Sequence, residues 1–166
     1  MLIPGESSID KGDLADQLVS RGHGLVADDV VELQQIGPET VQGRCPPMLR
    51  DFLEVRGLGV LNIRSIFGET AVRPRKALRL IVHLELPANG AYQERDRLAT
   101  RSGTRSVLGV EIPTVTLTVA PGRNLAVLVE AAVRNYILIT RGIDSTRDFI
   151  ARQAAAMRPG GEPRTD

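Results

Sequence analysis

The feature that most constrains the fold is a glycine-started loop between a short apolar segment and a helical one. Met1-Leu2-Ile3 has the composition of a strand end, and from Lys11 to Arg21 apolar residues recur three and four positions apart, as on one helix face. A strand, a loop with a glycine and a lysine, and a helix are the parts of a P-loop, where backbone amides and a helix N-terminus bind phosphate. Their order predicts an α/β fold, with a P-loop-containing nucleotide-binding core, a mixed sheet and flanking helices.

The loop matches the P-loop pattern only in part. The pattern asks for Gly, four free residues, Gly, Lys and then Ser or Thr; here Asp10 stands at the second Gly and Gly12 at the hydroxyl residue. Like charges about 4 Å apart repel by about 4 kcal/mol at an effective dielectric constant of about 20, and the missing hydroxyl normally binds Mg²⁺. We therefore expect weak phosphate binding and poor binding of Mg·ATP, with a loop that merely caps the helix as the alternative. The candidate cofactor-binding residues are Gly5, Glu6, Ser7, Ser8, Ile9, Asp10, Lys11 and Gly12.

An acidic pair follows the next apolar segment. Leu25-Val26-Ala27 has strand composition and ends in Asp28-Asp29. Folds of this type place acidic chemistry at the carboxyl edge of a strand beside the phosphate loop, and burial of both carboxylates would raise the pKa of one of them. The alternative is a solvated turn, because most acidic residues are exposed. His23 and His83 lack a metal-spaced partner, so we expect them to be core or supporting residues rather than metal ligands.

Three later segments give clear patterns. Leu78 to Glu85 is predicted as a buried strand, and Leu125 to Arg141 as a strongly apolar helix. Val107 to Ala120 is rich in β-branched residues and is predicted as strand material broken by Pro113. Strands interspersed with helices in this way support the α/β prediction.

Other segments give weaker patterns. Met48 to Val55 has helical spacing, and residues 87–105 are polar and predicted as a long exposed loop. Ser145 with Asp148 three residues later resembles a capping box, which predicts a last helix to about Met157. We expect one domain over residues 1–157 and a disordered tail over 158–166.

The totals exclude several classes of function. The net charge of +1 gives no bulk electrostatic case for binding nucleic acid or a membrane surface, and no apolar run approaches the roughly 20 residues of a membrane span. Cys45 is the only cysteine, which excludes an internal disulfide and suits a reducing compartment. We therefore expect a cytoplasmic protein with no nucleic-acid or membrane partner.

Five stretches of the sequence resemble the bifunctional HPr kinase/phosphorylase family of bacteria, in the family's order and spacing. The most distinctive is the run Glu-Val-Arg-Gly-Leu-Gly within the second stretch. The resemblance covers roughly residues 5 to 150. The stretches are 22–29, 53–62, 67–73, 80–85 and 121–127.

The resemblance implies an enzyme that phosphorylates a serine of the phosphocarrier HPr with ATP or pyrophosphate, and that reverses the reaction with inorganic phosphate. It implies Mg²⁺ as a cofactor, assembly as a homo-hexamer, and a catalytic domain over residues 1–157, and we expect the family's separate N-terminal domain to be absent. Because Asp10 and Gly12 depart from the P-loop pattern, a non-catalytic relative that binds HPr or regulates stays open as an alternative. So does an enzyme that only removes the phosphate.

The resemblance also implies roles at matching positions. Lys11 would contact the phosphates, and Asp29 would be the general base that takes the serine proton and the acid of the reverse reaction. Glu54 would bind Mg²⁺. Arg97 would clamp the transferring phosphoryl group, which suits a side chain that is always charged and bidentate. The segment needed for dephosphorylation would be Val119, Ala120, Pro121, Gly122 and Arg123.

Overall fold

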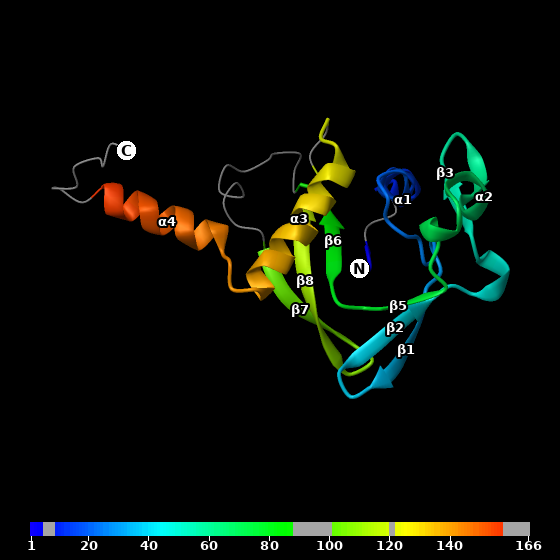
Figure 1. Cartoon of the computed structure of the whole chain (residues 1–166), viewed down its shortest axis with the longest axis horizontal. Coiled ribbons are helices and arrows are strands. Elements are labelled where there is room, and N and C mark those ends of the chain that lie inside the picture. Colours follow the sequence, from blue (N-terminus) through cyan, green and yellow to red (C-terminus); the bar gives the residue numbers. More distant parts are fainter. Residues whose placement is uncertain (5–8, 88–100, 120–121, 158–166) are drawn as a thin grey trace.

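The computed structural model describes residues 1–4, 9–87, 101–119 and 122–157, which form a mixed α/β body from which the last helix extends (Figure 1). Two short 3₁₀ helices, 47–49 and 69–71, interrupt the loops. In chain order the elements are α1 (Lys11–Ser20), β1 (Glu32–Gly37), β2 (Thr40–Arg44), β3 (Phe52–Val55), β4 (Gly59–Asn62), α2 (Ile63–Phe67), β5 (Arg75–Ala77), β6 (Ile81–Glu85), β7 (Arg101–Val107), β8 (Val110–Thr118), α3 (Leu125–Thr140) and α4 (Ser145–Ala156).

The central sheet is mixed, as the sequence predicts. Strand β6 pairs with β8 in parallel, and β7 pairs with the other edge of β8 in antiparallel orientation. The N-terminal stub lies on the free side of β6, where the N–H of Leu2 donates to the oxygen of Leu80 at 2.9 Å and the N–H of Val82 donates to the oxygen of Leu2 at 2.9 Å. The chain thus enters α1 from a segment that runs parallel to β6 and β8.

Strand β6 is buried on both faces, which explains its nearly continuous apolar sequence. Leu80, Val82 and Leu84 pack with α1, α3 and β8 in one cluster, whereas Ile81 packs with Val41 of β2 in another. Successive side chains of a strand point to opposite faces, so one run of residues serves both clusters.

Helix α1 also lies between two cores. Leu14 and Leu18 face the central sheet and α3, while Val19 packs against Leu53 of β3 and Ile63 of α2. The hairpin of β3 and β4 therefore covers the side of α1 that faces away from the sheet (Figure 1). This arrangement brings β3 to the first turn of α1.

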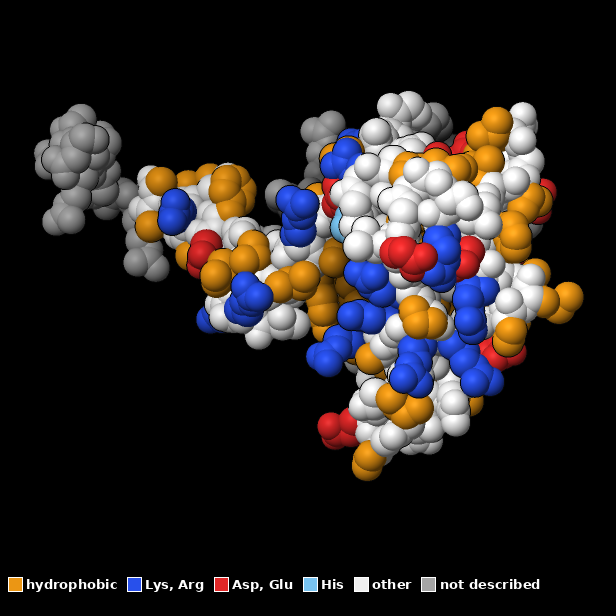
Figure 2. Space-filling model, turned by 45° about the vertical axis from the view of Figure 1, so that its right-hand side comes forward, with side chains coloured by type: hydrophobic (Ala, Val, Ile, Leu, Met, Phe, Trp, Pro, Cys, Tyr) orange, Lys and Arg blue, Asp and Glu red, His pale blue; other side chains and the backbone are white. Residues whose placement is uncertain are grey.

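Strands β1, β2 and β5 form a separate antiparallel sheet below the central one (Figure 1). Figure 2 shows that Lys and Arg side chains gather over this part of the body. The exposed basic residues of this sheet and of the segment just before β5 are Arg44, Arg73, Arg75 and Lys76. The net charge of +1 thus conceals a local basic face.

Some sequence predictions about the elements are wrong. Residues 48–55 form no α-helix: a 3₁₀ turn at 47–49 precedes β3. The predicted loop 87–105 is too long, because residues 101–105 belong to β7. Residues 88–100 of that predicted loop lie outside the described part. Pro113 does not break β8, because pairing with β6 begins only at Thr114.

The last helix is confirmed, but its cap differs from the prediction. Asp144, not Ser145, is the N-cap, since its Oδ1 accepts the N–H of Arg147 at 3.1 Å. None of the α4 residues, all of which the structure describes, is buried. The predicted tail 158–166 lies outside the described residues. Among the helices described, none has the length and apolar character that crossing a membrane requires.

Candidate functional site

The candidate site lies at the carboxyl edge of the parallel strands. The N–H of Leu84 donates to the oxygen of Pro4 at 3.3 Å, and the N–H of Val119 donates to the oxygen of Glu85 at 2.8 Å. The N-terminal stub, β6 and β8 therefore end side by side. In parallel sheets this edge is where ligands bind, and two predicted segments start here: the loop 5–12 after Pro4, and the segment 119–123.

Asp10 is the N-cap of α1. Its Oδ1 accepts the N–H of Asp13 at 3.1 Å, and its Oδ2 lies 3.4 Å from Nε of Arg56. The sequence predicts a carboxylate directed at the phosphate site, but in the structure both oxygens have partners within the protein. Asp10 therefore satisfies a helix amide that phosphate would otherwise use, and Arg56 offsets part of its charge.

Gly12 lies against the backbone of β3. A Cβ built on Gly12 would stand 2.1 Å from the carbonyl oxygen of Glu54. The absence of a side chain is thus a packing requirement of the contact between α1 and β3 in this arrangement. It also places the backbone of Glu54 against the first turn of α1, which Lys11 begins.

Acidic groups gather beside the first turn of α1. Oδ2 of Asp28 accepts the N–H of Glu54 at 2.9 Å. Burial is the main cause that raises the pKa of Asp28, and the charges of Asp29 and Glu54 raise it further, while the hydrogen bond from Glu54 and the charge of Lys11 lower it. Lys11, Asp28, Asp29 and Glu54 therefore share one electrostatic environment.

The carboxylates of this environment suit a magnesium ion chemically. Within the described residues, no group of three or more His, Cys, Asp or Glu side chains is arranged to hold a metal ion. Mg²⁺ is usually bound by one or two carboxylates together with phosphate oxygens and water rather than by a protein cage. The exposed carboxylate of Glu54, with Asp28 and Asp29 nearby, fits that chemistry.

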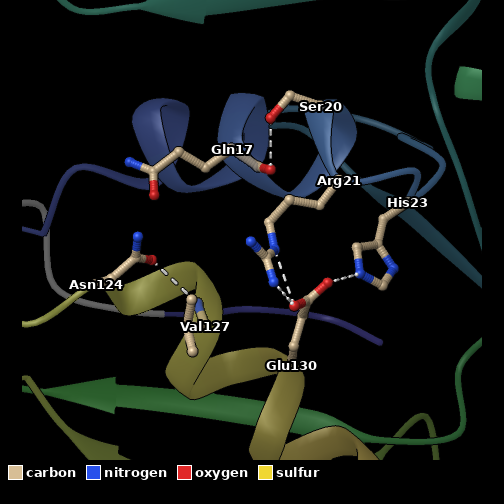
Figure 3. A network of polar contacts seen from close by, with 7 residues as sticks. All are labelled: Gln17, Ser20, Arg21, His23, Asn124, Val127 and Glu130. Atoms are coloured by element: carbon tan, nitrogen blue, oxygen red, sulfur yellow. Dashed lines mark hydrogen bonds and ion pairs between the residues drawn. The ribbon is translucent and has the colours of Figure 1, made fainter.

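An ion-pair network around the buried Glu130 lies at the other end of α1 (Figure 3). Glu130 of α3 accepts a hydrogen bond from Nε of Arg21 at 2.8 Å and pairs with the same guanidinium through Nη2. Its other oxygen lies 2.6 Å from Nε2 of His23, which must carry the proton because an ionised carboxylate only accepts. Hydrogen bonds from Arg21 and His23 lower the pKa of Glu130 to about 2. The prediction that His23 is a supporting residue fits this position.

Sequence reasoning missed Glu130, Arg21 and Arg56. Glu130 had one available signal, since it is an acidic residue within the apolar run of α3, and a charge in such a place usually has a partner. It is 7% exposed and is the one buried charged residue in the part of the chain that the structure describes. Nothing in the local sequence identified its partners.

The stability that Glu130 contributes should depend on pH. Its folded pKa of about 2 lies below the ordinary value of 4.5, so the ionised carboxylate stabilises the fold above about pH 4.5, and this contribution is lost as pH falls toward 2. We expect the melting temperature of the wild type to fall more between about pH 5 and about pH 2 than the melting temperature of Glu130→Gln does, because only the wild type loses this carboxylate charge. Thermal melts across this range check the prediction, and parallel losses in the two proteins would contradict it.

The predicted site residues fall partly within the described residues and partly outside them. Residues 5–8 of the loop, Arg97, Ala120 and Pro121 lie outside the described residues. The charges of Lys11, Asp29 and Glu54 all act on Asp28, so these predicted site residues share one electrostatic environment. Gly122 and Arg123 are exposed and lead into α3, whose N-cap is Asn124.

Fold and site together define a mixed α/β domain in which a lysine on the first turn of a helix shares one electrostatic environment with three carboxylates from other segments. The family model of the HPr Serine kinase C-terminal domain matches residues 1–153. The chain therefore belongs to that family, which confirms the resemblance seen in the sequence.

Individual relatives agree with this assignment. The chain is 63% identical over 158 residues to the HPr kinase/phosphorylase of Chromobacterium violaceum, covering 95% of this chain and 50% of that protein. It is 57% identical over 166 residues to the one from Neisseria meningitidis serogroup B, covering 100% and 52%. The chain thus spans about half the length of the curated relatives it matches. The structure of the Hpr(Ser) kinase/phosphatase from Coxiella burnetii matches with a TM-score of 0.77 and 34% identity, over 89% of this chain and 88% of that one.

Proposed function

We propose that this chain carries the catalytic unit of an HPr kinase/phosphorylase. It transfers a phosphoryl group from ATP or pyrophosphate to a serine of HPr, and it reverses the transfer with inorganic phosphate. The observation that carries the proposal is the shared environment of Lys11, Asp28, Asp29 and Glu54 at the first turn of α1. Phosphoryl transfer needs positioned charges of both signs more than covalent chemistry, and the names of the relatives supply the substrate.

Asp29 is the general base of the proposed reaction. It is exposed, so a serine on a protein substrate can reach it, and it would return the proton in the reverse direction. Asp28 is half-buried and accepts the N–H of Glu54, which makes it a support for that segment rather than a free acceptor. Lys11 would balance phosphate charge at the helix N-terminus.

The remaining roles rest on the family resemblance. Residues 5–12 would form the phosphate loop of a P-loop core, Arg97 would clamp the phosphoryl group, and residues 119–123 would serve dephosphorylation. Glu54 would hold Mg²⁺, which when bound neutralises developing charge on the phosphates. The position of Val119 beside Glu85, at the edge where the loop begins, supports a place for 119–123 at the same site.

Assembly and location are also proposals. HPr would be the partner, and the protein would work in the cytoplasm as a homo-hexamer. Helix α4 extends from the body and exposes Phe149 and Ile150 by 48% and 54%. Exposed apolar side chains on an otherwise unburied helix support a role in contacts between subunits.

A second candidate is a relative that binds HPr or regulates without turnover. The contact between Gly12 and the carbonyl of Glu54 favours it, because this packing leaves no room for the hydroxyl side chain that normally binds Mg²⁺. Asp10 also favours this candidate, because its side chain accepts the N–H of Asp13 that a phosphate would otherwise use. The two candidates share the fold and differ in turnover alone.

One paired assay separates the two candidates. The chain is incubated with HPr, Mg²⁺ and radiolabelled ATP or pyrophosphate, and separately with phosphoserine-HPr and inorganic phosphate. We expect label on HPr in the first reaction and pyrophosphate release in the second. Binding of HPr by calorimetry without turnover in any reaction would contradict the kinase proposal and support the second candidate.

A further inference from the structure

The network around Glu130 connects two elements that are far apart in sequence. Glu130 is nearly buried, whereas the side chains of Arg21 and His23 are 43% and 45% exposed. Arg21 is the C-cap of α1, and the N–H of His23 donates to the oxygen of Leu18 at 3.0 Å, so both partners belong to the end of that helix. Figure 3 shows both side chains converging on the carboxylate from the same turn. The network therefore joins α3 to one defined point on α1.

The two segments that the network joins are each continuous in sequence with part of the proposed site. After His23 the chain is fixed by Leu25, whose N–H donates to the oxygen of Ala71 at 2.8 Å, and then reaches Asp28 at the N–H of Glu54. On the other side, Glu130 lies in the first two turns of α3. Segment 119–123, the proposed dephosphorylation segment, precedes that helix in the sequence, so the network joins the chain that leads to Asp28 to the helix that follows this segment.

Apolar packing alone does not explain a charge at this place. Leu14, Leu18 and Val129 already pack α1 and α3 against the sheet, and apolar contacts are not directional. A buried carboxylate, by contrast, is destabilising unless its partners are present, so it selects one arrangement of the two helices over others with similar apolar burial.

We infer that Glu130 is a positioning residue that couples the start of α3 to the segment carrying Asp28 and Asp29, through its contacts with Arg21 and His23. The coupling itself is a property of the fold. Its catalytic consequence rests on the proposed function, because only there do residues 119–123 and Asp29 act in one reaction.

Hydrogen exchange followed by mass spectrometry tests the coupling on the full chain. Arg21→Gln changes only the α1 side, so faster exchange of amides 122–130 would report transmission to α3; Glu130→Gln should likewise speed exchange of amides 21–29. We expect increases of roughly 2- to 30-fold, the range typical of residues that modulate coupling. Arg134→Gln, on the exposed face of α3, is the matched control and should leave both segments unchanged.

The outcomes distinguish the coupling from ordinary packing. Exchange that changes only in the element carrying the substitution would overturn the inference. If Glu130→Gln fails to fold, Arg21→Gln still tests it, because Arg21 is partly exposed, and Arg21→Lys should restore most of the protection by returning the charge. Coupled exchange in a chain without turnover would leave the inference intact and overturn the proposed function.

An activity readout adds the catalytic part. In an active chain, Arg21→Gln should lower kcat for phosphorolysis more than kcat for phosphorylation, with KM for HPr unchanged, because the network leads to segment 119–123. Arg21→Lys should recover the ratio of the two rates. An equal loss in both directions would assign Glu130 to general packing.

Discussion

Replacing Asp29 by asparagine is expected to lower kcat for phosphoryl transfer to HPr by about 10²- to 10⁴-fold, the usual contribution of a general base. Asparagine has nearly the same shape but cannot take the serine proton. Asp29 is exposed, so the fold should be unaffected and KM for HPr should change little. Initial rates at saturating HPr, with a thermal melt of each protein, check the prediction.

Two variants control for charge and for position. Glu39→Gln neutralises an exposed carboxylate in the turn between β1 and β2 and should leave kcat unchanged. Asp28→Asn keeps an oxygen that can accept the N–H of Glu54, so we expect a smaller loss than for Asp29→Asn. The reverse order, with Asp28→Asn the more damaged enzyme, would assign the base to Asp28 and contradict our choice.

The sequence predicts correctly those elements in which buried apolar residues recur in a regular pattern along the whole element. Helix α1 shows Leu14 and Leu18 on one face, and α3 is apolar over most of its length. Strand β6 is buried on both faces and so shows a continuous apolar run. In each case the packing of a whole element leaves a periodic signal in the local sequence.

The elements it misses depend on contacts that the local sequence does not contain. Residues 52–55 alternate between exposed and buried only because β4 pairs with them and α1 covers one face. Strand β7 is exposed over residues 101–106, so its polar sequence resembles a loop until β8 pairs with it. Tertiary pairing overrides weak local preference in both.

The candidate site shows the same division. Lys11 was found from the P-loop pattern, Asp29 from the acidic pair and the resemblance, and Glu54 from the resemblance alone. All three share one electrostatic environment with Asp28. The pairing of Arg21 with Glu130 spans 109 residues, and no spacing rule reaches that far. For Asp10 the sequence indicates a charge near the phosphate loop, but the N–H of Asp13 and the side chain of Arg56 determine where that charge is directed.

Gly12→Ala is expected to destabilise the fold by roughly 1–3 kcal/mol, the usual cost of forcing a larger group into a packed contact. The new Cβ would meet a backbone oxygen of β3, which cannot turn aside as a side chain can, so β3 must move away from α1. The better helix propensity of alanine, about 1 kcal/mol at most, offsets only part of this. Urea denaturation of the two proteins measures the difference.

Gly103→Ala is the matched control, because a Cβ there would meet no heavy atom of the described residues within 4 Å. It should leave the free energy of unfolding nearly unchanged, and equal effects of the two substitutions would contradict the packing role of Gly12.

The same contact sets the outcome of restoring the P-loop pattern with Asp10→Gly and Gly12→Ser together. Replacing an N-cap by glycine costs only a few tenths of a kcal/mol, and the ion pair of Asp10 with Arg56 involves a guanidinium that is 75% exposed, so the loss of stability should come from the Gly12→Ser change. If kinase activity rises in this less stable variant, the missing hydroxyl and the added carboxylate limit turnover in the natural chain. If stability falls and activity does not rise, activity depends more on the contact between α1 and β3 than on the hydroxyl. The reason is that a shift of Glu54 also moves the N–H that donates to Asp28.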